Sequence, residues 1–241
     1  MLAVGRCPTR RSRCAGRFRV VAAPTPLTVS AQGPYSETWG VERFGEPCRE
    51  CAFSFTLTTE QAIASVMAIP DSYEGLVGSA DGSLTHPDLD WNVGAYVCHV
   101  ADNLHVWAQW LAGAALYAEA GVPGYEERLL GDARFYTRVP VRGALWQLRQ
   151  ATRSWHEAVT VALPHEVVLA HASRGPQSVH DVVRSNAHDA FHHGWDISRI
   201  LEYAAKTGTA GAAGTTGTAD AAGTAGAAGT AGAAGTAGAA G

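Results

Sequence analysis

Residues 178–205, SVHDVVRSNAHDAFHHGWDISRILEYAA, are the stretch that decides the fold class. Ser178 with Asp181 in the turn that follows is typical of a helix N-terminus, because a serine oxygen can accept a hydrogen bond from a backbone N–H of the first turn. Apolar residues then recur at helical spacing, which predicts an amphipathic helix reaching about residue 205. Its apolar face contains Val183, Ala190, Ile197, Ile200 and Leu201.

Three further helical segments precede this one. The first begins at a Thr58/Thr59 cap and contains Pro70, which should kink or divide it because proline removes a backbone N–H. The second runs from 91 to about 120, starting after Asp88 or Asp90 and ending at Gly121 and Pro123, and the third spans about 141–163, with a short strand at 166–170 after it. Helices of roughly 20 to 30 residues favour a bundle over a sheet. We therefore expect an all-α fold, an antiparallel four-helix bundle.

Composition divides the chain into four regions. The first 19 residues hold six Arg and no acid, and residues 207–241 hold only Ala, Gly and Thr apart from Asp220. The tail cannot bury enough apolar area to offset the cost of ordering it. Pro24, Pro26, Gly33 and Pro34 indicate an irregular N-terminal region. We expect a disordered basic leader at 1–36, a lead-in segment at 37–57 that is too aromatic for a linker, the bundle at 58–206, and a disordered tail at 207–241.

Charge and hydropathy exclude several classes of partner. Without the leader the chain has 12 basic and 22 acidic residues, and an acidic body argues against nucleic acid, whose phosphates need clustered Lys and Arg. No apolar run approaches the roughly 18 residues that a membrane helix needs. The five cysteines are odd in number and sparse, which favours a reducing cytoplasm over a disulfide framework.

The helix at 178–205 carries a candidate metal pair. His188 and His192 are four residues apart, so both imidazoles lie on one helix face and could bind one ion. His193 points about 140° away from His188 on an ideal wheel and cannot join that pair. The alternative is that the histidines belong to the solvated side of the helix, with Ser185, Asp196 and Arg199 on the same polar stripe.

The second predicted helix offers a third candidate ligand. His99 lies at the edge of a wide apolar arc, a position that suits a residue facing a cleft between helices. Asp102 and Asp196, each one turn after a histidine, could accept hydrogen bonds from ligand imidazoles or could simply be solvated. Three imidazoles would leave an open coordination position, as in catalytic sites. Zinc is the first choice for nitrogen ligands, with nickel or ferrous iron as alternatives.

Two of these segments resemble a known family. VCHVADN at 97–103 resembles the second-helix signature of the DinB-like (YfiT-type) metalloenzyme superfamily, and HDAFHHGWDI at 188–197 resembles its fourth-helix signature. The resemblance covers roughly 58–206 and implies that His99, His188 and His192 are the metal ligands. It also implies a small-molecule substrate, a bundle that often forms a homodimer, and a transferase or isomerase reaction using a low-molecular-weight thiol.

The functional alternatives stay open at this point. A metal-dependent enzyme would hold its substrate in a cleft, with Trp107, Trp110 and Trp195 either lining it or belonging to the bundle core. A non-catalytic metal-binding or assembly module would use the ion only to join helices. The sequence identifies neither a catalytic residue nor a thiol-binding residue.

Cys48 and Cys51 form a separate C-x-x-C motif in the lead-in segment. The motif resembles a Pro-Cys-x-x-Cys lead-in found before the bundle in some actinobacterial DinB-like proteins. Three interpretations remain: a structural metal site that recruits Cys98 or a histidine, a redox dithiol, or unreactive reduced thiols.

Overall fold

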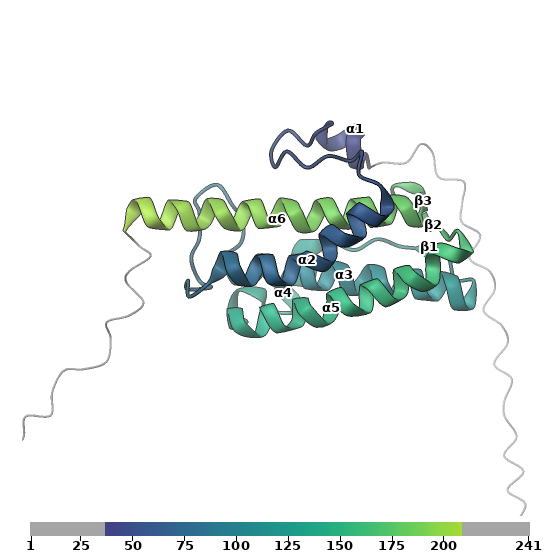
Figure 1. Ribbon diagram of the computed structural model, residues 1–241. Coiled ribbons are helices and arrows are strands. Elements are labelled where there is room, and N and C mark those ends of the chain that lie inside the picture. Colours follow the sequence, from purple (N-terminus) through teal and green to yellow (C-terminus); the bar gives the residue numbers. More distant parts are fainter. Residues whose placement is uncertain (1–36, 209–241) are drawn as a thin grey trace, which may run out of the picture. The chain divides into compact units, whose positions relative to one another are not determined.

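The computed structural model describes residues 37–208, in which four long helices form a bundle (Figure 1). The predicted leader at 1–36 and the predicted tail beyond residue 208 lie outside the described residues. No described helix is both long and apolar enough to cross a membrane. The four bundle helices are α2 (Thr59–Val77), α3 (Val93–Tyr117), α5 (Val141–Ala162) and α6 (Val179–Thr207). The mostly helical fold and its four-helix core are therefore as expected.

The helices begin where local hydrogen bonds favour a start. Thr58 and Ser178 each form a capping box with the residue three positions on, Gln61 and Asp181. Helix α3 begins two to four residues later than its predicted aspartate caps, because the Asn92 side chain accepts a hydrogen bond from the Ala95 N–H. It ends at Tyr117, before the predicted stop at Gly121 and Pro123.

Pro70 lies inside α2 and does not divide it. Its ring is buried, and buried residues such as Val66 and Tyr73 lie on either side of it. Tertiary packing of both halves therefore keeps the helix continuous in spite of the missing N–H. Of the two predicted effects of Pro70, a kink or a division, the division does not occur.

The helix directions are mixed rather than uniformly antiparallel. Helix α2 runs parallel to α6, because Thr59 contacts His180 while Tyr73, further along α2, donates to the Ala190 carbonyl, further along α6. Helix α3 runs antiparallel to α6, since early and late contacts are reversed: His99 lies near His193, and Asn103 near Asp189.

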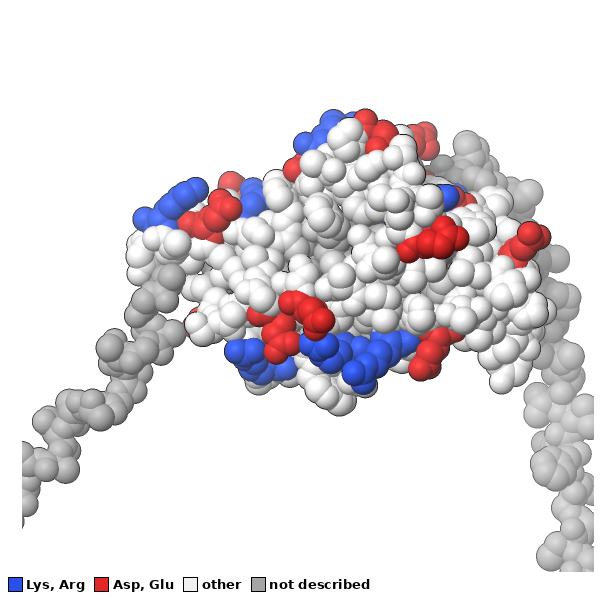
Figure 2. All heavy atoms as spheres, in the orientation of Figure 1, with Lys and Arg blue, Asp and Glu red and all other residues white. Residues whose placement is uncertain are grey.

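Helices α2 and α5 run antiparallel. Arg149 pairs with Asp71 and Glu74, whereas Arg142, which precedes it on α5, reaches the Gly78 carbonyl beyond the end of α2. Figure 2 shows acidic and basic side chains next to one another along this edge of the molecule. Helix α5 thus runs in the same direction as α3. The connection between them is long because the chain must return along the bundle before α5 begins.

That connection and the next contain the short elements. The first holds β1 (Gly121–Val122), α4 (Glu127–Ala133) and the 3₁₀ turn η1 (Tyr136–Arg138), and the second holds η2 (Leu163–His165), β2 (Val168–His171) and β3 (Gly175–Ser178). Strand β2 pairs in parallel with β1 and antiparallel with β3. The expected strand at 166–170 is thus present, but the sequence did not indicate its two partners.

The lead-in segment contains the short helix α1 (Gly40–Phe44) and packs against the N-terminal half of α6. Arg184 of α6 donates to the Leu57 carbonyl at 3.1 Å. Glu37 pairs with Arg174 in the turn between β2 and β3 at 2.7 Å. These contacts position the lead-in segment beside the histidines of α6.

Candidate metal centre

Helix α6 carries two adjacent stripes of metal-ligating side chains. His188 and His192 lie on one stripe, and Asp189 and His193, also four apart, lie on the next, about 100° around the helix. The first stripe groups with Cys48 and Cys51 of the lead-in segment, and the second groups with His99 of α3. In each pair of adjacent residues, 188–189 and 192–193, the first residue therefore belongs to one group and the second to the other.

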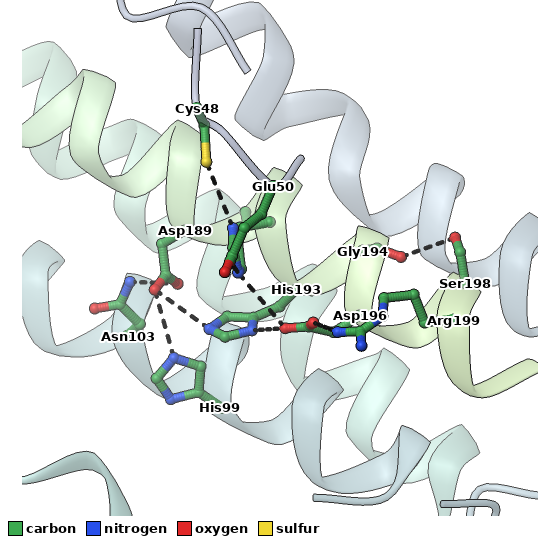
Figure 3. A network of polar contacts seen from close by, with 12 residues as sticks. Cys48, Glu50, His99, Asn103, Asp189, His193, Gly194, Asp196, Ser198 and Arg199 are labelled. Carbon is green, nitrogen blue, oxygen red and sulfur yellow. Dashed lines mark hydrogen bonds and ion pairs between the residues drawn. The ribbon is translucent and has the colours of Figure 1, made fainter. Parts of the chain in front are cut away.

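We call His99, Asp189 and His193 the cleft site (Figure 3). Asp189 Oδ1 lies 3.5 Å from His99 Nε2 and 3.6 Å from His193 Nε2. The two imidazole rings stand edge to face with centroids 4.7 Å apart. One ligand atom from each residue lies within 4.8 Å of the other two, so the three could share one ion.

Neighbouring amide and phenol groups position Asp189. Asn103 donates a hydrogen bond of 2.7 Å to Asp189 Oδ2, and Tyr125 in turn donates one of 2.8 Å to Asn103 Oδ1. Burial disfavours the charged carboxylate, but His99, His193 and the Asn103 hydrogen bond outweigh it and hold the pKa of Asp189 well below its usual range. Asp189 is therefore ionised at neutral pH, with Oδ1 available as a ligand.

Asp196 orients His193. The carboxylate of Asp196 accepts a hydrogen bond from His193 Nδ1 at 3.0 Å (Figure 3). A proton held on Nδ1 leaves the lone pair on Nε2, the atom that faces Asp189. Arg199 approaches the other oxygen of Asp196 at 3.6 Å. This hydrogen bond selects the tautomer that a metal ligand requires.

The third member, His99, is buried with an unpaired nitrogen. Its side chain is 1% exposed, and its Nε2 has no hydrogen-bond partner among the described residues, because the 3.5 Å contact with Asp189 falls short of hydrogen-bond geometry. Burial lowers the pKa of His99, but the nearby carboxylate of Asp189 raises it more. An unpaired buried nitrogen facing a carboxylate is a place that a proton or a metal ion can occupy, so the donor set fits a divalent metal.

The cleft site borders a cavity of about 1010 Å³. Asp189 and His193 line it, and their side chains are 23% and 17% exposed, so the site is open on one side. Trp107 and Trp110 of α3 and Tyr125 also line the cavity. Trp107 and Trp110 thus line the cleft as one interpretation expected. Trp195 does not line this cavity; its ring lies near His192 and Arg199.

We call Cys48, Cys51, His188 and His192 the lead-in site. Their ligand atoms also lie within 4.8 Å of one another, and Cys48 Sγ is 3.9 Å from His192 Nδ1. All three described cysteines are free thiols. Cys98 lies elsewhere, on α3, where burial and the neighbouring Asp102 raise the pKa of its thiol to about 12.

The structure thus distributes the three predicted histidine ligands over two groups. His188 and His192 do lie together, and His193 does not join them, as helical geometry predicted. His99, however, groups with Asp189 and His193. Asp196 contacts His193 more closely than His192, at 3.0 against 3.9 Å. Metal binding by His99, His188 and His192 stays an untested prediction.

Asp102, a predicted partner of His99, contacts other residues, whereas Asp189, which was not predicted as a site residue, belongs to the cleft site. Asp102 accepts a hydrogen bond from Tyr136 and pairs with Arg134 at 2.8 Å, rather than orienting His99. Asp189 was missed, although its spacing of four residues from His193 is the same signal that selected His188 with His192. Periodicity alone gave no reason to prefer either stripe.

Comparison with known proteins supports the fold. No family model matches the chain, and no curated protein matches it. Among solved structures the chain is similar to YfiT from Bacillus subtilis, described as a probable metal-dependent hydrolase with an unusual four-helix bundle topology. The match has a TM-score of 0.51 at 15% sequence identity and covers 64% of this chain and 91% of that one. It confirms the expected YfiT-type four-helix bundle fold, whereas the actinobacterial detail has no support.

Proposed function

We propose that the protein is a metal-dependent enzyme in which His99, Asp189 and His193 hold one divalent ion beside the cleft. The observation that carries the proposal is the approach of His99 Nε2 and His193 Nε2 to Asp189 Oδ1, at 3.5 and 3.6 Å. An ion with tetrahedral bonds of about 2.0–2.2 Å spaces its ligand atoms roughly 3.3–3.6 Å apart. The two distances from Asp189 to the imidazoles therefore already match the spacing that such an ion requires.

The donor set narrows the choice of metal. Two imidazoles and one carboxylate are typical of catalytic zinc sites and of ferrous oxygenase sites. We propose zinc first, with ferrous iron or nickel as alternatives. When bound, the ion would act as a Lewis acid and lower the pKa of a water or thiol in its open position.

The protein's own groups would prepare this chemistry. Asn103 holds Asp189 so that one oxygen faces the imidazoles, and Asp196 keeps the proton of His193 on Nδ1. Substrate would approach from the cleft, because Asp189 and His193 are partly exposed there while His99 is buried. A cavity of about 1010 Å³ suits a small molecule, and Trp107 and Tyr125 offer it aromatic surface.

Two reactions are candidates, and they differ in the nucleophile, which is either a thiol or water. The resemblance to DinB-like proteins favours transfer or isomerisation with a low-molecular-weight thiol as cosubstrate. The Bacillus subtilis relative is described as a probable hydrolase, for which water takes the place of the thiol. We propose the thiol reaction, and a screen of electrophilic substrates with and without several thiols separates the two.

A non-catalytic module remains the second candidate. In that case the ion would only join α3 to α6, and the cleft would have no part in the function. The partial exposure of Asp189 and His193 favours the enzyme. Chelation separates the candidates: a small fall in melting temperature is expected for an open catalytic site, whereas unfolding indicates a module.

The decisive test compares metal content and turnover in untagged full-length variants. His193→Ala should lose one ion per chain and all turnover of any substrate that the wild type converts. His105→Ala is the matched control, because His105 is an exposed histidine on α3 and should change neither quantity. A wild-type protein without bound metal, or a His193→Ala variant with full metal content, would refute the proposal.

A further inference from the structure

The lead-in segment folds back so that its two thiols face α6. The Cys48 N–H donates to the Phe53 carbonyl at 2.8 Å, which closes the loop that contains Cys51. Both sulfurs then lie beside His188 and His192, with all four ligand atoms within 4.8 Å of one another. Residues more than 130 positions apart in the sequence thus converge at one point.

Three of the four residues of the lead-in site are buried. Cys48 is 3% exposed, Cys51 is 7% exposed and His188 is 4% exposed. Three aromatic rings of the lead-in segment surround His188, with centroid distances of 4.4, 5.5 and 4.8 Å from Phe44, Phe53 and Phe55. His192 is the partly exposed member: its side chain is 15% exposed, and it lines the cavity together with Cys48 and His188.

His188 provides an independent indication of a missing partner. Its Nε2 is buried and has no hydrogen-bond partner among the described residues. Leaving a buried polar atom unsatisfied costs about 1–3 kcal/mol, so such atoms are rare without a reason.

We propose that Cys48, Cys51, His188 and His192 hold a second, structural zinc ion that anchors the lead-in segment to α6. A tetrahedral zinc with bonds of about 2.3 Å to sulfur and 2.0–2.1 Å to nitrogen spaces its ligands roughly 3.3–3.8 Å apart. Cys48 Sγ and His192 Nδ1 are 3.9 Å apart, close to that spacing. Four protein ligands leave no open position, so this ion stabilises structure and takes no substrate.

The same ion shapes the cleft. Residues of the lead-in segment that precede and follow Cys48 in the sequence line the cavity: Trp39, Arg43, Phe44 and Arg49. Anchoring Cys48 and Cys51 to α6 therefore holds one cleft wall in place. Removal of this ion should loosen that wall without removing a ligand of the cleft site.

Cobalt substitution tests the proposal on the full-length chain. Cobalt bound to two thiolates gives a charge-transfer band in the near ultraviolet, and cobalt bound to imidazoles and a carboxylate does not. The wild type and His193→Ala should both show the band, and the Cys48→Ser/Cys51→Ser variant should lose it together with one ion per chain. Cys98→Ser is the matched control, because Cys98 is a buried thiol outside the site and should leave the band unchanged.

Thiol labelling tests the proposal without any substitution. In the native protein Cys48 and Cys51 should resist alkylation. A chelator should increase the rate of alkylation of both thiols at least tenfold, and peptide mass spectrometry identifies the labelled residues. A native Cys48–Cys51 disulfide would overturn the proposal and favour the redox interpretation. Labelling that is unchanged by the chelator, or a cobalt protein without the thiolate band, would also overturn it.

Discussion

His192 and His193 are adjacent in the sequence, yet their imidazoles face different partners. His192 Nδ1 lies 3.9 Å from Cys48 Sγ, and His193 Nε2 lies 3.6 Å from Asp189 Oδ1. One helical step turns the second side chain by about 100°, which is enough to direct it into another group. This single step separates the proposed structural ion from the proposed catalytic one.

Asp196→Asn should weaken metal binding at the cleft site. The variant can still accept the hydrogen bond from His193 Nδ1, but it loses the charge that makes the imidazole a better ligand. Loss of such a partner typically costs about 10- to 100-fold in metal affinity, which chelator competition can measure. Arg199→Gln is the control: Arg199 contacts Asp196 from outside the site, so its effect should be several times smaller.

The two α5 tryptophans should differ sharply in their effect on stability. Trp155 is 0% exposed and donates to Asn186 at 2.8 Å, so Trp155→Ala leaves a cavity and an unpaired amide. We expect a loss of about 3–5 kcal/mol in the free energy of unfolding, measured in urea. Trp146 is 65% exposed, and Trp146→Ala should cost less than about 0.5 kcal/mol. Equal effects would contradict the assigned packing.

Two glycine substitutions should act in opposite directions. A Cβ at Gly194 of α6 would lie 3.1 Å from Cε1 of Tyr73, whose hydroxyl bonds the Ala190 carbonyl. Gly194→Ala should therefore destabilise the α2–α6 contact by about 1–3 kcal/mol. Gly75 of α2 is exposed, with nothing within 4 Å of the added carbon, so Gly75→Ala should stabilise by about 0.5–1 kcal/mol. Thermal unfolding of both variants checks the signs.

The metal-free protein should lose stability in mild acid. The pKa of His188 is lowered to about 4, so between about pH 6.5 and pH 4 the unfolded chain binds a proton that the folded chain does not. The free energy of unfolding should fall over this window by up to about 3 kcal/mol from His188. His192, whose pKa burial and the neighbouring His193 also lower, acts in the same direction.

His99 acts with the opposite sign and provides the comparison. Because Asp189 raises its pKa, its contribution is present below about pH 6.5 and is lost as the pH rises through the folded value. His188→Asn should flatten the acid loss in urea titrations, whereas His165→Asn, at an exposed position, should leave it unchanged. An acid loss that persists in His188→Asn would show that other groups cause it.

Several features could be predicted because they depend on local interactions. The extents of α5 and α6, the Ser178 cap and the strand near residue 168 follow from hydrogen bonds and periodicity within short stretches. The same geometry paired His188 with His192 and excluded His193 from that pair. The caps of α3 and the continuity of α2 through Pro70 were predicted less well, since neighbouring helices and loops contribute to both.

Thus the sequence by itself determined four long helices, a pair of imidazoles one turn apart, and a cysteine pair ahead of the bundle. It could not determine which residues of other elements lie beside each stripe of α6. A helical wheel gives the directions of side chains around one helix axis, but it gives no distance to another element. Only the tertiary structure decided that α3 brings His99 to Asp189 and His193, and that the lead-in segment brings Cys48 and Cys51 to His188 and His192. The physical reason is that packing between elements, which sets these distances, depends on the whole core.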